Sequence, residues 1–116
     1  MLRTSLLRKP VVNRTIVSRL YYAAHHSAKF LLKLRGYDTD SWRIGVHQKS
    51  FKAVERDFVS TGLMSKKTIS MLATMKQKRQ KADYNLGITL QESEVDKMFR
   101  LCSQFLAECD RLKEVI

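Results

Sequence analysis

The sequence predicts an all-α protein, an up-and-down antiparallel bundle of four to five helices. Three observations carry this prediction. Helix breakers are scarce, with one proline and four glycines among 116 residues. Apolar residues recur at intervals of three and four, as one face of a helix requires. The length suits one hydrophobic core, so residues 1–116 are expected to form a single domain with short connections between its helices.

The first long helix is expected over residues 11–35. Pro10 suits its first turn, and Gly36 suits the position just past its end. Residues 1–9, which precede Pro10, are expected to add a short or truncated first helix. The apolar face of the long helix is expected to contain Ile16, Leu20, Ala23, Ala24, Leu31 and Leu34.

Three more helices are expected over residues 42–60, 65–86 and 89–116. Ser65 suits the N-cap of the third, and Thr89-Leu90-Gln91-Glu92 fits a capping box at the start of the fourth. The second helix has its apolar residues at Val46, Phe51, Val54, Phe58 and Val59. The inner face of the third is expected to be Ile69, Leu72, Met75 and Ala82. The fourth carries a broad apolar stripe at Val95, Met98, Phe99, Cys102, Phe105, Leu106, Cys109 and Leu112.

The chain is strongly basic, with a formal net charge of +11. Residues 89–116 carry four basic and six acidic side chains, so the excess positive charge lies in residues 1–88. Such an excess attracts polyanions, and nucleic acid is the leading partner. An acidic protein, an anionic membrane surface or a merely soluble basic surface would also account for it.

Two classes of protein receive no support from the sequence. No apolar run approaches the roughly 20 residues that a membrane span needs. No glycine-rich phosphate loop, metal-ligand spacing or acidic pair is present, so no metal or cofactor is expected. Cys102 and Cys109 lie on the apolar stripe and are interpreted as buried thiols, which favours a reducing, cytoplasmic location.

One face of the first long helix carries an unusual row of side chains. Arg19 and His26 are seven residues apart, nearly two helical turns, and are separated by about 10 Å along the axis. Tyr22 lies between them, and Lys29 and Lys33 continue the row. A histidine can move a proton to or from a ribose hydroxyl, and an arginine can hold a phosphate through two hydrogen bonds. Together they could cleave RNA without metal, with two copies of the helix completing the site about a two-fold axis.

The alternative for this row is structural. An arginine and a histidine share a helix face by chance very often, and Arg19 and Tyr22 would then be solvated or paired. His25 lies roughly 120° away from that face and is expected to be a packing or capping residue.

Three stretches of the sequence form an ordered set of motifs. Residues 18–28 read S-R-L-Y-Y-A-A-H-H-S-A, Gly45-Val46-His47 is followed by Phe51, Phe58-Val59 and Gly62, and Arg79 is followed by Ala82-Asp83-Tyr84. In this order they resemble the S-R-x-Y-Y-A-x-x-H-x-A signature, the second helix and the R-x-x-A-D-Y element of one prokaryotic subfamily of the HEPN family (higher eukaryotes and prokaryotes nucleotide-binding). The resemblance covers about residues 15–86, and the C-terminal helix fits by pattern alone.

The resemblance implies a dimerising helical bundle in which Arg19 and His26 form a composite, metal-independent ribonuclease site. Many members are toxins that are paired with a minimal nucleotidyltransferase as antitoxin, and others bind nucleotide without cutting. The chain departs from active members at Leu20, where they usually place Asn, Asp or His. That departure favours the rival function, a non-catalytic module that binds a nucleotide or a partner protein.

Other residues are candidates for substrate binding, each with a structural alternative. His47 would line the same cleft by resemblance, or serve as an N-terminal or packing residue. Asp83 would hold Arg19 or a histidine in place, or pair with Arg79 at i, i+4. Tyr84 ends the third helix beside it. Lys76, with Lys78, Arg79 and Lys81, would contact an RNA backbone or form a solvated face. Tyr37 and Trp42 would stack on a base or, more simply, cap the core.

Overall fold

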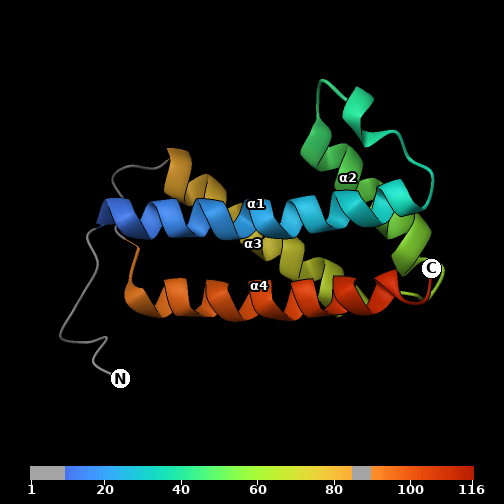
Figure 1. Cartoon of the computed structure of the whole chain (residues 1–116). Helices are drawn as coiled ribbons and strands as arrows, with labels where there is room; N and C mark the ends of the chain where they lie inside the picture. Colours follow the sequence, from blue (N-terminus) through green and yellow to red (C-terminus); the bar gives the residue numbers. More distant parts are fainter. Residues whose placement is uncertain (1–9, 85–89) are drawn as a thin grey trace.

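The computed structural model describes residues 10–84 and 90–116 (Figure 1). Its four α-helices are α1 (Pro10–Leu34), α2 (Val46–Val54), α3 (Lys66–Tyr84) and α4 (Glu92–Lys113). A 3-10 turn, η2 (Thr39–Ser41), precedes α2, and a π-helical turn, η3 (Glu55–Val59), extends it. The all-α prediction is confirmed for these ranges, which contain no strand. The short helix expected over residues 1–9 lies outside the described residues.

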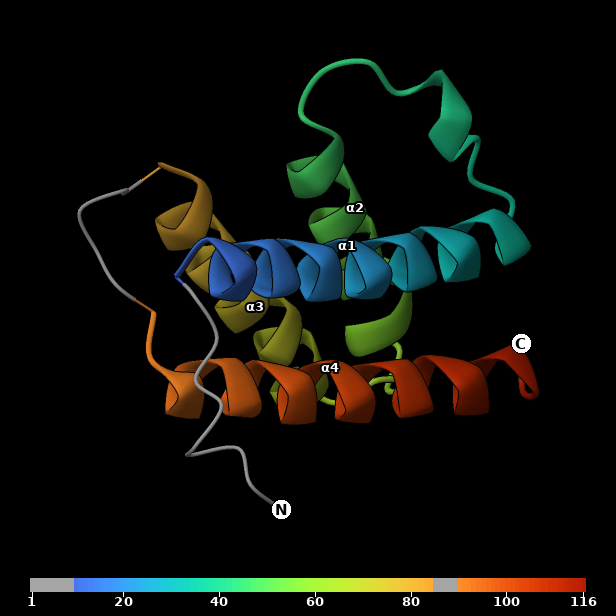
Figure 2. The same ribbon diagram turned by 60° about the vertical axis from the view of Figure 1, so that its left-hand side comes forward.

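The three long helices do not follow a simple up-and-down order. Figures 1 and 2 show that α1 and α4 lie side by side and run in the same direction, whereas α3 runs opposite to both. In a strict up-and-down bundle of four helices, the first and last would be antiparallel. The difference arises because α2, which has nine residues before η3 continues it, is short and packs against α1, near its C-terminal half in Figures 1 and 2. It therefore acts as part of the connection between α1 and α3 rather than as a full-length bundle member.

The helix ends follow local sequence signals. Just past α1, Gly36 adopts a φ of 95°, a left-handed conformation that favours glycine, and the Tyr37 N–H donates to the Leu32 carbonyl oxygen. At the start of α3 the Ser65 hydroxyl accepts a hydrogen bond of 3.1 Å from the Thr68 N–H, which confirms the expected cap. Helix α4 begins at Glu92, three residues later than expected, and Thr89 lies outside the described residues.

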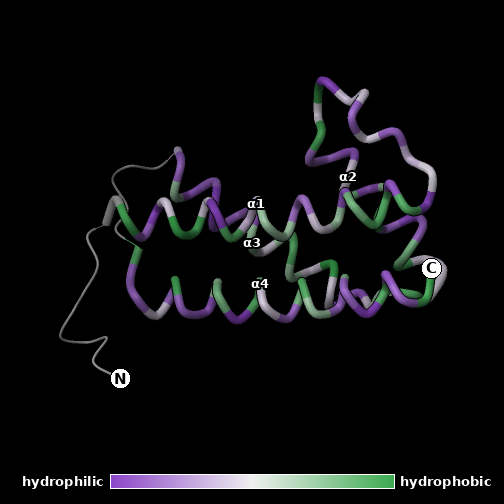
Figure 3. Tube along the Cα trace, in the orientation of Figure 1, coloured by the Kyte–Doolittle hydropathy of each residue, from purple (hydrophilic) through white to green (hydrophobic). Residues whose placement is uncertain are grey.

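The predicted apolar faces are right for α3 and largely right for α4. All four inner residues expected for α3 are buried, and so are Val95, Met98, Cys102, Phe105, Cys109 and Leu112 of α4. Phe99 differs, since it is 41% exposed. Figure 3 shows apolar and polar residues alternating along α1 and α4 rather than forming unbroken runs, as expected for helices with one buried face.

The predicted face of α1 was partly wrong. Ala24 and Leu31 are buried and Ile16 and Leu20 are partly buried, but Ala23 and Leu34 are exposed. The helix instead buries Val17, Tyr21, Ala28 and Leu32. The buried face of α1 is therefore rotated from the predicted one, toward Tyr21. A tyrosine ring buries far more apolar surface than the methyl group of Ala23, which explains this rotation.

The two cysteines are free and buried, as predicted. The Cys102 thiol in α4 donates to the Leu20 carbonyl oxygen in α1 over 3.4 Å, which places these parallel helices in contact near their middles. Burial raises the pKa of the Cys109 thiol to about 11. Among the described helices, none is long and apolar enough to cross a membrane.

Candidate functional site

Five rings of α1 and α2 meet where the two helices touch, and we call them the Tyr–His cluster: Tyr21, Tyr22, His25, His26 and His47. Four of them come from two successive turns of α1, because residues four apart lie one above the other on a helix. His47 is the second residue of α2 and packs against His25 with the two ring planes tilted by 40° and 4.3 Å between ring centres. The structure thus brings His47 of α2 next to the tyrosines and histidines of α1.

A short hydrogen bond fixes the inner part of the cluster. The Tyr21 hydroxyl and Nδ1 of His47 are 2.7 Å apart. Burial raises the pKa of Tyr21 to about 12, so its hydroxyl keeps its proton, and the tautomer of His47 sets the direction of this hydrogen bond. Burial, followed by the charge of Arg79, lowers the pKa of His47, which favours its neutral form. A neutral ring that accepts at Nδ1 carries its proton on Nε2.

His25 is a packing residue, as predicted, and it is only 4% exposed. Burial, helped by the nearby His47, lowers the pKa of His25 to about 3. Sequence reasoning nevertheless missed its place in the cluster, since its ring centre lies 5.7 Å from that of His26 and 5.9 Å from that of Tyr21. The repeated four-residue spacing of Tyr21–His25 and Tyr22–His26 was the signal that could have found it.

Arg79 enters the cluster from α3. Its Nη1 donates to the Tyr22 hydroxyl over 3.3 Å and to Oδ2 of Asp83 over 3.1 Å. Its Cζ lies 5.3, 5.5 and 5.9 Å from the ring centres of Tyr21, Tyr22 and Tyr84. The alternative of an i, i+4 pair between Arg79 and Asp83 is therefore confirmed. The Arg79 side chain, which is 9% exposed, needs such a partner because an unpaired buried charge is costly.

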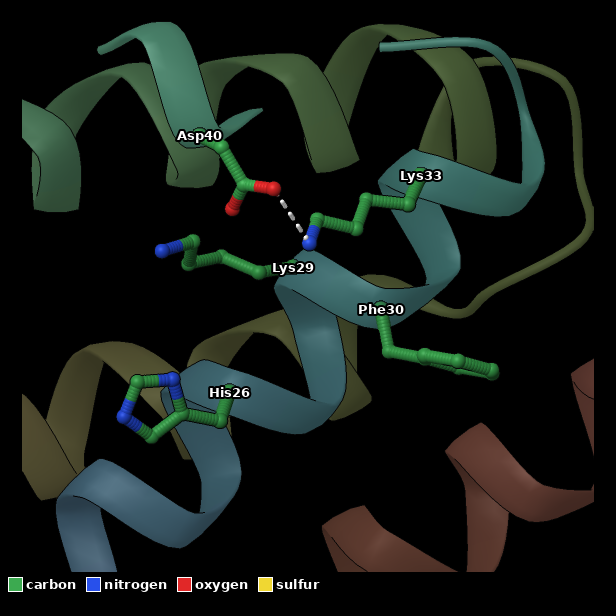
Figure 4. A pocket seen from close by; sticks show the side chains of 5 residues that line it. All are labelled: His26, Lys29, Phe30, Lys33 and Asp40. Atoms are coloured by element: carbon green, nitrogen blue, oxygen red, sulfur yellow. Dashed lines mark hydrogen bonds and ion pairs between the residues drawn. The ribbon is translucent and has the colours of Figure 1, made fainter. Parts of the chain in front are cut away.

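The outer face of α1 presents the predicted row of polar side chains. Arg19, Tyr22, His26 and Lys33 are exposed, and Lys29 is half-buried. Beyond His26 lies an open pocket of about 270 Å³, lined by His26, Lys29, Phe30, Lys33 and Asp40 (Figure 4). Arg19 is not among the lining residues. One protomer therefore offers His26 with two lysines at this pocket, and Arg19 two turns further along the same helix.

An ion pair closes one side of this pocket. Nζ of Lys33 lies 2.8 Å from Oδ2 of Asp40, and Figure 4 shows this bond spanning the gap between α1 and η2. The hydrogen bond and the charge of Lys33 lower the pKa of Asp40. Figure 4 also shows Lys29 reaching toward the side where His26 lies, while Phe30 points away from it. Lys29 is therefore the lysine of this pocket whose side chain extends to the side of His26.

The charges around the cluster are mostly positive. Arg79, Lys76, Lys29 and His26 all lower the pKa of His47 through their charge. Lys76 and Lys78 are half-buried and Lys81 is exposed, so the basic cluster of α3 is reachable from solvent through its lysines while Arg79 is turned inward. An anion that approaches His26 and Tyr22 would meet a favourable potential.

Two other expectations concerned residues outside this cluster. Tyr37 and Trp42 pack edge to face, 6.3 Å between ring centres, and both lie partly buried against the core, which agrees with their capping alternative. Leu20 also packs partly buried against the core. The residue after Arg19 therefore does not belong to the polar row.

Comparison with protein-family models, with curated protein sequences and with solved structures finds no match to this chain. Over residues 10–84 and 90–116, no three His, Cys, Asp or Glu side chains are grouped so that they could hold a metal ion.

Proposed function

We propose that this chain is a HEPN-type, RNA-directed protein that cleaves RNA without metal. The observation that carries the proposal is the exposed His26, which borders an open pocket with Lys29 and shares its helix face with Arg19 and Tyr22. An accessible histidine among cations suits proton transfer next to a bound phosphate. The net charge of +11 supports a polyanionic substrate.

In the proposed reaction His26 accepts the proton of a ribose 2′-hydroxyl. The 2′-oxygen attacks the adjacent phosphorus, the bond from phosphorus to the 5′-oxygen breaks, and the proton passes to that leaving oxygen. The products are a 2′,3′-cyclic phosphate and a 5′-hydroxyl. Arg19 holds the phosphate and stabilises the charge that builds up on its oxygens.

The site is proposed to be composite in a homodimer. Arg19 and His26 are about 10 Å apart along a continuous helix, which is far for two groups that act on one phosphate. Two α1 helices packed about a two-fold axis would bring Arg19 of one protomer to His26 of the other. This assembly, a cytoplasmic location and a nucleotidyltransferase partner acting as antitoxin are parts of the same proposal.

Cleavage of single-stranded RNA in the presence of EDTA is the test. We expect wild-type protein to release 2′,3′-cyclic phosphate ends, and His26→Ala and Arg19→Ala each to lose about a hundredfold or more of the rate. Circular dichroism must show that both variants are folded. Wild-type protein that cuts no RNA, with or without metal, would contradict the nuclease.

Mixing the two inactive variants tests the composite site. A heterodimer of Arg19→Ala and His26→Ala protomers contains one site with both wild-type groups, so mixing should restore about a quarter of the wild-type rate. If each site lies within one protomer, mixing restores nothing. Light scattering that shows a monomer at micromolar concentration would also contradict the dimer.

The rival function is a non-catalytic module that binds a nucleotide or a nucleotidyltransferase. Leu20 favours it, because this apolar residue packs against the core where active relatives of the resembled subfamily carry a polar group. Binding of a nucleotide that is weakened by Arg19→Ala, in a protein that never cuts RNA, would establish this function instead.

A further inference from the structure

Two tyrosines beside the candidate site are accessible to solvent. Tyr22 of α1 is 37% exposed, and Tyr84 at the end of α3 is 76% exposed. Core packing accounts for Tyr21, which is buried, but it does not account for these two rings. In a basic protein, exposed aromatic rings are surfaces on which unpaired bases stack, because every base has a π-face.

The guanidinium of Arg79 contacts both exposed rings. Cζ of Arg79 lies 5.5 Å from the ring centre of Tyr22 and 5.9 Å from that of Tyr84. Its Nη1 is bonded to the Tyr22 hydroxyl and to Asp83, the residue before Tyr84. Arg79 is buried, so it is poorly placed to bind substrate itself. Its geometry suits a positioning residue that holds two rings of different helices near each other.

The surroundings also favour a phosphate backbone. Lys76 and Lys29 lie close enough to the cluster to act on His47 through their charge, and His26 is beside the Tyr22 ring, 6.2 Å between ring centres. Asp83 is engaged by Arg79. A strand whose bases rest on Tyr22 and Tyr84 would therefore have cations available for its phosphates.

We propose that Tyr22 and Tyr84 form a stacking platform for unpaired bases, positioned by Arg79, and that the substrate class is single-stranded RNA. The inference rests on the proposed RNA-directed function and deepens it. Bases in a duplex are stacked on one another and cannot reach the rings. A base on Tyr22 would hold its own ribose close to His26, whereas paired RNA would be bound through phosphates alone.

Binding to strands that cannot be cut tests the platform apart from the chemistry. A fluorescein-labelled deoxythymidine oligonucleotide lacks the 2′-hydroxyl nucleophile, and an abasic strand of equal length keeps the phosphates but has no bases. Anisotropy titrations at low salt should show tighter binding of the thymidine strand. Tyr22→Ala and Tyr84→Ala should each weaken it by about fivefold to a hundredfold and leave binding of the abasic strand unchanged.

Two matched variants control for ring loss and for hydroxyl loss. Tyr84→Phe keeps the ring and should bind like wild type. Phe99→Ala removes a ring of similar exposure on α4, 41%, and should change neither affinity. Circular dichroism monitors folding. If Tyr22→Ala unfolds, Tyr84→Ala still tests the platform, because Tyr84 lies at the end of α3.

Equal affinity of wild-type protein for the two strands would overturn the platform, and so would an equal loss on both strands in Tyr84→Ala. The outcomes for the platform can be distinguished from the outcomes for the proposed nuclease activity. Base-dependent binding without RNA cleavage keeps the platform and rejects the enzyme, whereas cleavage without base dependence does the reverse. Failure to bind either strand at low salt would reject the platform, and the cleavage assay alone decides on the nuclease.

Discussion

Tyr21 and His25 on the inner face of α1 and Tyr22 and His26 on its outer face are chemically the same pair, shifted by one residue. The inner pair is buried, with a tyrosine whose pKa is raised to about 12 and a histidine whose pKa is lowered to about 3. The outer pair is exposed and borders cations. One residue turns a helix by about 100°, and that rotation alone separates the two environments.

The inner pair therefore stabilises the fold, whereas the outer pair is accessible from solvent. His25 and Tyr21 anchor His47, and with it the start of α2, to α1. His26 makes no comparable buried contact and lies at the pocket instead. Identical substitutions in the two pairs should therefore separate stability from activity.

The largest contrast is expected between His25→Ala and His26→Ala. Removing the buried imidazole leaves a cavity, and we expect a loss of about 2 kcal/mol or more in the free energy of unfolding. Removing the exposed one should change it by less than about 0.5 kcal/mol. Urea denaturation followed by circular dichroism measures both. Equal losses would break the distinction between the two faces.

A pH dependence of stability should sharpen the same contrast. The unfolded chain protonates His25 near its ordinary pKa of 6.5, whereas the folded chain does so near 3. Between these values the unfolded chain binds more protons, so stability falls as the pH falls, by about 1 kcal/mol per pH unit once the unfolded residue is protonated. The pKa of His47 is also lowered, so protonation of His47 likewise reduces the stability of the folded chain as the pH falls.

Melting temperatures between pH 7 and pH 4 check this prediction. His25→Leu fills the site without a titrating group and should flatten the profile. A wild-type melting temperature that does not fall between pH 6.5 and pH 4 would show that His25 is not protected from protonation.

The smallest contrast concerns the two tyrosine hydroxyls. Tyr21→Phe removes a 2.7 Å hydrogen bond to His47 and should cost about 1 kcal/mol. Tyr22→Phe removes a longer bond from Arg79, 3.3 Å, at a ring that reaches solvent, and should cost less. Urea unfolding ranks the two, and NMR of the His47 ring nitrogens reports the tautomer. If Tyr22→Phe lost more free energy of unfolding than Tyr21→Phe, the buried Tyr21 hydroxyl would not be the one that stabilises the fold more.

Periodicity sufficed to predict the helices from sequence, but not their directions. The expected helix over 42–60 begins four residues later, and nothing in its pattern shows that it packs across α1 rather than joining the bundle. The face of α1 was misjudged because Ala23 and Leu34 fit the spacing as well as Val17 and Leu32 do. Only contacts with three other helices decide between them.

The candidate site was predicted in part. The row from Arg19 to Lys33 follows from spacing, and the Arg79–Asp83 pair from its i, i+4 interval. The role of Arg79 beside Tyr22 spans 57 positions of the chain, and no local rule reveals a contact at that separation. The roles of Arg19, His26, Asp83 and Lys76 toward a substrate stay predictions.

The parallel contact between α1 and α4 has a consequence for the order in which the molecule folds. The bond from Cys102 to the Leu20 carbonyl joins residues 82 positions apart, and that from Asn13 to the Leu90 carbonyl joins residues 77 apart. Contacts of such separation form late, because the chain must close a long loop before it gains them. During synthesis α1 emerges early, yet its side facing α4 stays uncovered until the last helix has followed. The helix that carries His26 is thus made before α4, and its packing is completed only after α4 has been made.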